Sequence, residues 1–400
     1  MKKVIIFLLL ILIPFNVFAS DTMPVISELE STIKETENSS LAKNAKSAIL
    51  IEATTGEILF EKNSNEKLAP ASMTKIMSML VIVESIEKGV INWDDVITVS
   101  ENASSMGGSQ ILLETGEQMK VSDLFKGIAV ASGNDAVVAL AETIAGTVDE
   151  FVNMMNQKAK ELGLKNTNFK NPHGLDEANH YSSAYDMSIM AKELIKHEKV
   201  LEFTSIYEDY LRKGTDREFW LVNTNKLVRF YSGVDGLKTG YTSSAGYCLT
   251  ATAKKNNVRL IAVVMNEESS STRNAEVTSM LDYGFAKIKT VEIANKDTVI
   301  KKIEIDKAKD KFVELVPIET ISIVKQKTEQ VGEITYDVKL DKVKAPIKKG
   351  DVVGKLIVME DGKKIKESNL TVNKDVEEAS FIELYLRNIT DMINGKIIFK

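Results

Sequence analysis

The chain of 400 residues is long enough for two or three domains, and its 44% hydrophobic and 27% charged residues are typical of a folded globular protein. The formal net charge of −6 argues against nucleic acid as a partner, and the composition selects no other function. The single cysteine, Cys248, can form no disulfide within the chain. Its apolar surroundings predict a small buried side chain in a strand, without a reactive thiol.

The first nineteen residues have the pattern of a secretory signal peptide. Lys2 and Lys3 precede an apolar run over residues 4–13, and the Val-Phe-Ala sequence that ends at Ala19 has small residues where a signal peptidase requires them. An apolar run of about ten residues is too short to span a bilayer, which takes roughly 20. We therefore expect cleavage after Ala19 and a mature protein outside the cytoplasmic membrane, with a retained anchor as the alternative.

The mature chain begins with a polar stretch, over residues 20–45, that predicts a lead-in helix or spacer. Residues 47–63 predict two strands around a Thr-Gly turn, because apolar residues alternate on both sides of it. Helical periodicity then predicts helices over residues 71–89, 122–144, 149–162, 184–196 and 271–287. Two strands in series precede the last of these helices. This order of strands and helices predicts an α+β domain with an antiparallel sheet.

Beyond about residue 290, short segments with alternating Val, Ile and Thr predict a second, β-rich domain. The last stretch has apolar residues at helical spacing, namely Phe381, Ile382, Tyr385, Ile389, Met392 and Ile393. Such a helix lies on a membrane surface or packs on its own domain. We therefore divide the chain into a signal peptide (1–19), a lead-in segment (20–45), an α+β domain (46–289), a β-rich domain (290–378) and an amphipathic, membrane-associating segment (379–400).

Ser72 and Lys75 lie three positions apart, so on a helix they share one face and the lysine can fold back over the serine hydroxyl. A serine becomes a nucleophile when a base removes its proton, and a lysine is such a base when burial or another cation lowers its pKa. Pro70 predicts a helix start, which would point free backbone N–H groups toward Ser72. Apolar neighbours such as Met73 and Ile76 would bury the lysine.

Ser-x-x-Lys alone is weak, because the pattern occurs six times in this chain. Two further motifs follow in order, Ser132-Gly133-Asn134 and Lys238-Thr239-Gly240, and the trio is the signature of serine penicillin-interacting enzymes. The stretches "ASMTKIMS", "ASGNDAVVALAE", "HYSSAYDM" and "GLKTGYTSSAGYCL" resemble the low-molecular-mass penicillin-binding proteins, the D-alanyl-D-alanine carboxypeptidases of the type 5 and sporulation-linked kind. The resemblance covers nearly the whole mature chain, including the β-rich domain and the amphipathic end.

The resemblance implies a penicillin-binding/β-lactamase-like transpeptidase domain and a role for each motif residue. Ser72 is expected to be the acylated nucleophile and Lys75 its proton acceptor. Ser132 is expected to relay protons between Lys75 and the leaving amine, and the Asn134 amide to hold the peptide backbone of the substrate. The implied reaction removes the terminal D-alanine from peptidoglycan stem pentapeptides without a cofactor, and β-lactam antibiotics are expected to acylate the same serine.

The strand with Lys238, Thr239 and Gly240 is expected to pair edge-on with the substrate, and the glycine to leave room for that approach. Lys238 would add a cation that disfavours a charged Lys75 and attracts the substrate's carboxylate.

Two residues outside the three motifs complete the implied site. The backbone N–H of Tyr241, with that of Ser72, is expected to form the oxyanion hole. Arg273 lies 35 positions after Lys238, where the family keeps a carboxylate-binding arginine. A surface arginine at a helix start is the alternative for Arg273, because a guanidinium suits carboxylates anywhere.

His173 and His180 lie on either side of the loop "NPHGLDEANH". No third His, Cys or Asp at ligand spacing accompanies them, so the sequence predicts no metal site. Similar enzymes carry the His-Gly-Leu sequence in this loop, and we interpret both histidines as residues that shape the loop or line the rim of the cleft.

Two other functions are compatible with parts of this pattern. A class A type β-lactamase needs a Glu-x-x-x-Asn loop between the second and third motifs, and here Glu177 precedes Asn179 by only two positions. We therefore expect slow release of penicillin. A cell-wall or penicillin-binding protein without turnover is the other alternative, and the intact motifs argue against it.

Overall fold

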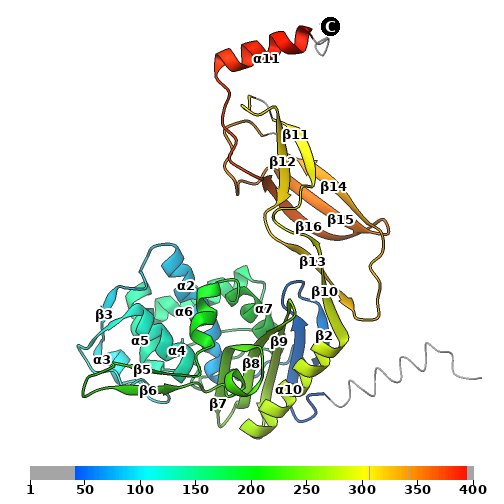
Figure 1. Ribbon diagram of the computed structural model, residues 1–400. Helices are drawn as coiled ribbons and strands as arrows, with labels where there is room; N and C mark the ends of the chain where they lie inside the picture. The colour runs from blue at the N-terminus through cyan, green and yellow to red at the C-terminus, as the bar shows by residue number, and fades with distance from the viewer. Residues whose placement is uncertain (1–40, 306, 342, 394–400) are drawn as a thin grey trace, which may run out of the picture. The chain divides into compact units, whose positions relative to one another are not determined.

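The computed structural model describes residues 41–305, 307–341 and 343–393 (Figure 1). The predicted signal peptide, most of the predicted lead-in segment and residues 394–400 lie outside the described residues. The predicted α+β fold with a second, β-rich domain is confirmed.

A five-stranded antiparallel sheet forms the centre of the first domain, in the order β2-β1-β9-β8-β7. The strands are β1 (Ser47–Glu52), β2 (Ile58–Lys62), β7 (Val234–Thr242), β8 (Gly246–Lys255) and β9 (Val258–Glu267). Residues facing both ways from β1 and β9 are buried, so both faces of the sheet centre are covered. Helices α7 (Ala184–Leu194) and α10 (Ser270–Lys287) pack on these strands. Strand β7 is at the edge, and one side of its backbone remains unpaired within the sheet.

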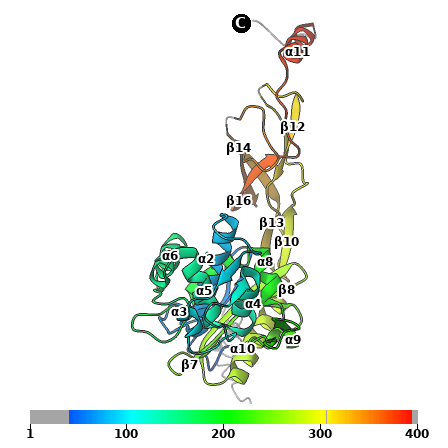
Figure 2. The same ribbon diagram turned by 90° about the vertical axis from the view of Figure 1, so that its left-hand side faces the viewer.

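Helix α2 (Lys75–Glu87) packs against four other helices of the first domain (Figures 1 and 2). It follows the short 3₁₀-helix η1 (Ala71–Thr74) and contacts α4 (Val121–Ala131), α5 (Asn134–Ala145), α6 (Val148–Glu161) and α7. Every residue from Lys75 to Val83 is buried, which explains why this segment is apolar on all sides.

The prediction of one helix over residues 122–144 was wrong, because the structure has two helices there. Ser132 has a left-handed backbone conformation (φ 65°), which ends α4, and Gly133 is the residue from which α5 starts. A left-handed residue cannot continue a right-handed helix, so the second motif lies at the break.

Helix termini elsewhere follow their sequence signals. The side chains of Thr147, Ser183 and Ser269 accept backbone N–H groups at the starts of α6, α7 and α10. The sequence did not indicate several short elements, which are β3 (Val96–Thr98), α3 (Glu101–Ser104), β4 (Gln118–Lys120), α8 (Glu198–Thr204), β5 (Glu208–Leu211), β6 (Phe219–Val222) and α9 (Leu227–Phe230).

The β-rich domain has its own buried apolar cluster and an antiparallel sheet in the order β11-β12-β16-β15-β14. Its strands are β10 (Ile288–Ala294), β11 (Lys301–Glu304), β12 (Phe312–Pro317), β13 (Ile321–Gln326), β14 (Ile334–Leu340), β15 (Gly354–Glu360) and β16 (Lys363–Val372), and β10 pairs with β13. Helix α11 (Phe381–Ile393) follows and exposes most of its large apolar side chains. Among the described residues, no helix has the length and apolarity needed to cross a bilayer.

Candidate active site

Ser72 lies on η1 and Lys75 is the first residue of α2, so the turn between the two helices sets their geometry. The Lys75 Nζ lies 3.1 Å from the Ser72 Oγ. Lys75 is fully buried, as the apolar sequence around it predicted, and its neighbours Met73 and Ile76 are equally inaccessible. Ser72 itself is partly exposed and lines a cavity. The arrangement therefore presents a hydroxyl to the cavity with an amine behind it.

Two carbonyl oxygens fix the Lys75 amine in addition to the serine. The Nζ donates to the Asn134 Oδ1 at 2.6 Å and to the backbone oxygen of His173 at 2.8 Å. Burial, and then the nearby cation of Lys238, hold the pKa of Lys75 well below its ordinary value, while Asp135 opposes this shift. A neutral amine has two hydrogens and one lone pair. It would satisfy both carbonyl oxygens and keep its lone pair for the proton of Ser72.

Ser132 and Asn134 come from the break between α4 and α5. Ser132 lines the same cavity as Ser72, is 3% exposed, and its hydroxyl has no hydrogen-bond partner among the described residues. Its proton relay to Lys75 therefore stays a prediction. The Asn134 amide holds Lys75 through its oxygen and the backbone oxygen of Gly107 through its nitrogen, at 2.7 Å. Its contact with the substrate backbone also stays a prediction.

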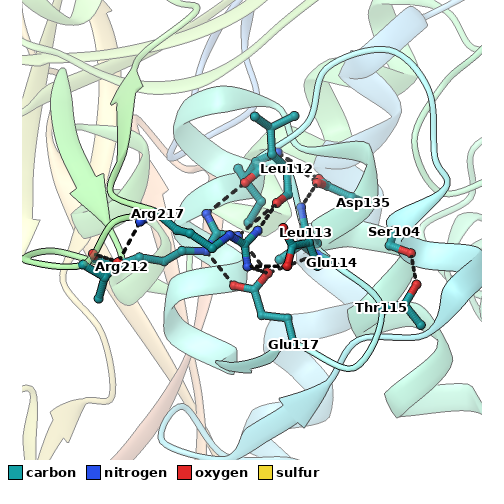
Figure 3. A network of polar contacts seen from close by, with 11 residues as sticks. Ser104, Leu112, Leu113, Glu114, Thr115, Glu117, Asp135, Arg212 and Arg217 are labelled. Carbon is teal, nitrogen blue, oxygen red and sulfur yellow. Dashed lines mark hydrogen bonds and ion pairs between the residues drawn. The ribbon is translucent and has the colours of Figure 1, made fainter.

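The loop before β4 forms a wall beside the second motif, and contacts from two sides hold it (Figure 3). On one side, the Asp135 carboxylate accepts the backbone N–H groups of Ile111 and Leu113 at 3.0 to 3.1 Å. On the other side, Arg212 of the β5–β6 hairpin meets Glu117 through two contacts, of 2.6 and 3.1 Å. These contacts fix the loop whose Gly107 oxygen binds the Asn134 amide.

Strand β7 carries the third motif and packs against η1. The outer edge of β7 is unpaired within the sheet, so a substrate could pair with it. Lys238 is 1% exposed and donates to the Thr239 backbone oxygen at 3.1 Å. Burial, and then Arg273, lower the pKa of Lys238 from 10.5 to about 7. The Thr239 hydroxyl donates to the Thr224 hydroxyl at 2.7 Å.

The structure gives a further reason for a glycine at position 240. A Cβ at this position would lie 2.7 Å from the Pro70 backbone oxygen and 3.1 Å from the Ala71 Cβ. The glycine therefore lets β7 approach the turn that carries Ser72. Gly240 also lines the cavity, and its expected role in leaving room for the substrate stays a prediction.

The remaining predicted site residues are on the same cavity, which has a volume of about 460 Å³. Tyr241 is 56% exposed, and its ring centroid lies 4.4 Å from that of Tyr247. Arg273 on α10 is 5% exposed, and its Nε and Nη2 both donate to the Asn274 Oδ1. Burial lowers the pKa of Arg273. The cavity is lined by Ser72, Ser132, Thr239, Gly240, Tyr241 and Arg273, together with Ser109, Thr224 and Lys226, which the sequence did not single out.

The two loop histidines are buried and neutral at pH 7. Burial lowers the pKa of His173 to about 3 and that of His180 to about 4. The His180 Nδ1 accepts the Lys170 backbone N–H at 3.0 Å, so its Nε2 carries the hydrogen and donates to the Thr74 hydroxyl at 2.8 Å. This contact ties the loop to η1 and supports a loop-shaping role.

Gly174 explains the His-Gly-Leu sequence of this loop. Its φ is +89°, and a Cβ there would lie 1.9 Å from the Ala71 backbone oxygen, so only glycine fits. The described residues contain no cluster of three or more His, Cys, Asp or Glu that could hold a metal ion. Cys248 is buried in β8, and burial raises its pKa to about 11.

Sequence reasoning missed Asp135, Thr224 and Lys226. Asp135 directly follows the second motif, but it fell in the middle of the helix predicted over residues 122–144, so no helix start marked it as a loop anchor. Thr224 and Lys226 lie in an irregular segment between β6 and α9, where no periodicity marks them.

Comparisons with known proteins identify relatives of both domains. A family described as D-alanyl-D-alanine carboxypeptidase (peptidase S11) matches residues 33–269, and one described as penicillin-binding protein 5, C-terminal domain, matches residues 289–378. The chain is 54% identical to the D-alanyl-D-alanine carboxypeptidase DacF of Bacillus subtilis over 90% of this chain and 92% of the relative. It is 36% identical to DacA of Escherichia coli K12 over 84% and 85% of the two chains.

Solved structures show the same likeness. Penicillin-binding protein 5 from Haemophilus influenzae has 37% identity and a TM-score of 0.66, over 84% of this chain and 98% of that one. Ampicillin-bound penicillin-binding protein D2 from Listeria monocytogenes has 29% identity and a TM-score of 0.55, over 62% of this chain and 98% of that one.

Proposed function

Because the chain belongs to the peptidase S11 family of serine D-alanyl-D-alanine carboxypeptidases, we propose that it releases the terminal D-alanine of peptidoglycan stem pentapeptides through an acyl-enzyme on Ser72. One observation supports this proposal most directly. Ser72 faces the cavity with the buried Lys75 amine 3.1 Å behind its hydroxyl, and the lysine is held by two carbonyl oxygens that leave its lone pair for the serine proton.

In the acylation step, the neutral Lys75 takes the Ser72 proton while Oγ attacks the carbonyl carbon of the penultimate D-alanine. The developing oxyanion accepts hydrogen bonds from the backbone N–H groups of Ser72 and Tyr241. The peptide bond breaks, and the amine of the terminal D-alanine takes the proton from Lys75, with Ser132 as the relay. Water then hydrolyses the ester and returns the proton to Ser72.

A carboxypeptidase must distinguish a chain end from a chain interior, and the free carboxylate of the leaving residue is the chemical difference. Thr239 and Arg273 line the cavity and supply a hydroxyl and a guanidinium, and Lys238 adjoins Thr239 with an amine that a bound carboxylate would keep protonated. Burial of these groups strengthens their attraction for a carboxylate, because water screens it less. We assign the recognition of the terminal carboxylate to this group.

The test compares a peptide that ends in D-Ala-D-Ala with the same peptide amidated at its C-terminus. The native enzyme should strongly prefer the free acid. Arg273→Ala should lose about 1.5 to 3 kcal/mol of transition-state binding, which is about tenfold to more than a hundredfold in kcat/KM on the acid, with little change on the amide. Equal cleavage of both peptides by the native enzyme would replace this function with an endopeptidase or a broader transpeptidase.

β-Lactam antibiotics are expected to acylate the same serine, because the lactam mimics the D-Ala-D-Ala amide. The ampicillin-bound and cefotaxime-bound structures of the Listeria relative support this expectation. Labelled penicillin should attach to Ser72, as peptide mapping would detect, and label that persists in Ser72→Ala would contradict the assignment. The predicted lack of a deacylating Glu-x-x-x-Asn loop leads us to expect slow release.

The substrate and the predicted signal peptide place the enzyme outside the cytoplasmic membrane in this proposal. Helix α11 is the proposed attachment to the outer face of that membrane. It exposes large apolar side chains to solvent, among them Phe381 (82% exposed), Ile382 (68%) and Ile393 (80%). Apolar area of this kind supports binding in the plane of a membrane surface.

A further inference from the structure

Lys226 is a half-buried lysine on the wall of the active-site cavity, and it has no ion pair with any described residue. Its Nζ lies 5.4 Å from the centroid of the Tyr207 ring. The guanidinium of Arg229, which also has no ion pair among these residues, lies 5.0 Å from the same centroid. Two cations next to one ring, without a carboxylate to neutralise them, create a positive potential at this rim.

Hydrogen bonds of Asn223 and Asn225 fix the backbone segment that leads to Lys226. The Asn225 amide donates to the Gly236 backbone oxygen at 2.9 Å and accepts the Leu227 N–H at 3.1 Å. Asn223 anchors the same segment by donating to the backbone oxygens of Thr204 and Ile206. Lys226 immediately precedes α9, so these contacts fix the point from which its side chain extends.

The position of Lys226 along β7 decides which part of a substrate it can meet. Thr224 and Thr239 share a hydrogen bond of 2.7 Å, and the Asn225 contact is with Gly236. Both contacts meet β7 at positions before Tyr241, where the proposed oxyanion hole lies, and the Thr239 contact is next to Lys238. Lys226 is therefore on the side assigned to the leaving residue and its carboxylate.

Arg273 already uses part of its guanidinium within the protein, and three of its five N–H hydrogens remain for a carboxylate. Its Nε and Nη2 already share the Asn274 Oδ1, at 3.1 and 2.9 Å. A carboxylate has two oxygens that accept several hydrogen bonds, so a second cationic donor has acceptors left to bind. The cavity lining supplies Lys226 for this purpose and includes no Asp or Glu that would repel the carboxylate.

We propose that Lys226 is a specificity-determining residue that, together with Arg273, selects substrates with a free C-terminal carboxylate. The inference rests on the proposed function, because it concerns the same leaving residue. It extends that function to a residue outside the three sequence motifs, and it adds a cation from a different element to the groups already assigned to the carboxylate.

The experiment measures kcat/KM of the full mature chain on the D-Ala-D-Ala peptide and on its C-terminal amide. Lys226→Met should lower the value for the acid about tenfold, mainly through KM, and leave the value for the amide within about twofold. Lys226→Arg should restore the preference for the acid. Lys160→Met is the matched control, because Lys160 is an exposed lysine of α6 that does not line the cavity.

The dependence of the acid-to-amide preference on ionic strength provides a second readout. A purely structural role of Lys226 would leave this dependence unchanged. Added salt should weaken the native preference for the acid more steeply than that of Lys226→Met, because one screened attraction is already missing in the variant. An unchanged acid-to-amide ratio in Lys226→Met, or an equal loss on both peptides, would overturn the role of Lys226 and leave the proposed function standing. A native enzyme without any preference would overturn both.

Discussion

Arg212 and Glu117 form a two-point ion pair that joins the β5–β6 hairpin to the loop beside the active site (Figure 3). The two side chains are only 10% and 11% exposed. The same guanidinium also donates to the backbone oxygens of Ile111 and Leu112. One side chain on a distant hairpin therefore neutralises a carboxylate and satisfies the backbone of a loop that has no regular secondary structure of its own.

Removing Arg212 should leave the Glu117 carboxylate mostly buried and without its main partner. We expect Arg212→Ala to lower the free energy of unfolding by about 3 kcal/mol, measured by urea denaturation. Arg217 is the matched control, because it also contacts Glu117 but is 34% exposed, and its removal should cost about 1 kcal/mol or less. Equal costs for the two variants would contradict the importance of the Arg212 pair.

Lys75→Met should slow the acylation of Ser72 strongly while leaving the fold intact. The methionine has a similar length and fills the buried space, but it offers no lone pair for the serine proton. The loss of a general base typically slows a reaction by a factor of about 10² to 10⁴. Stopped-flow acylation by a fluorescent penicillin, with circular dichroism as the control for folding, measures this. Acylation within tenfold of the native rate would contradict the role of Lys75.

The buried Lys238 should make stability depend on pH in a defined window. Its pKa falls from 10.5 to about 7 on folding, because of burial and then Arg273. Between these values the unfolded chain binds a proton that the folded chain has released, so the contribution of Lys238 to stability rises with pH. The difference in unfolding free energy between native protein and Lys238→Met should grow by up to about 1.4 kcal/mol per pH unit from pH 7.5 to 9.

Lys160→Met supplies the baseline for that measurement, since it removes a lysine from the exposed surface of α6. A difference that stays constant with pH, or shrinks as the pH rises, would show that Lys238 keeps its proton in the folded state.

Vesicle flotation tests the proposed membrane attachment through α11. The mature chain should float with phospholipid vesicles, and a version that ends at residue 378 should stay in the soluble fraction, because it lacks the exposed apolar side chains of the helix. Added salt should change the result little if apolar area provides the binding energy. Equal flotation of both versions would remove α11 from the proposal.

The sequence was sufficient to predict features that depend on neighbouring residues. The Ser72–Lys75 pair, the first hairpin and the helices expected over residues 149–162 and 184–196 each follow from a few adjacent positions, and spacing and periodicity determine them. Their order along the chain, with the three motifs, also predicted the fold class.

Features that depend on distant contacts could not be predicted in the same way. Arg212 binds a loop about 100 positions earlier in the chain, and no periodicity relates the two. The break at Ser132 was missed because the apolar pattern continues through it, while the backbone conformation there reverses its hand. The further reason for a glycine at position 240 became visible only when β7 was placed against η1.

Ser132 sets a limit on how far this protein can be made more robust without losing its function. A left-handed conformation costs a residue with a Cβ about 1 kcal/mol or more, and glycine adopts it without that cost. The buried hydroxyl adds to the cost, because it has no hydrogen-bond partner among the described residues. A laboratory selection for heat resistance alone would therefore favour glycine at position 132 and discard the hydroxyl. Directed evolution of this scaffold has to select for turnover and thermal tolerance together.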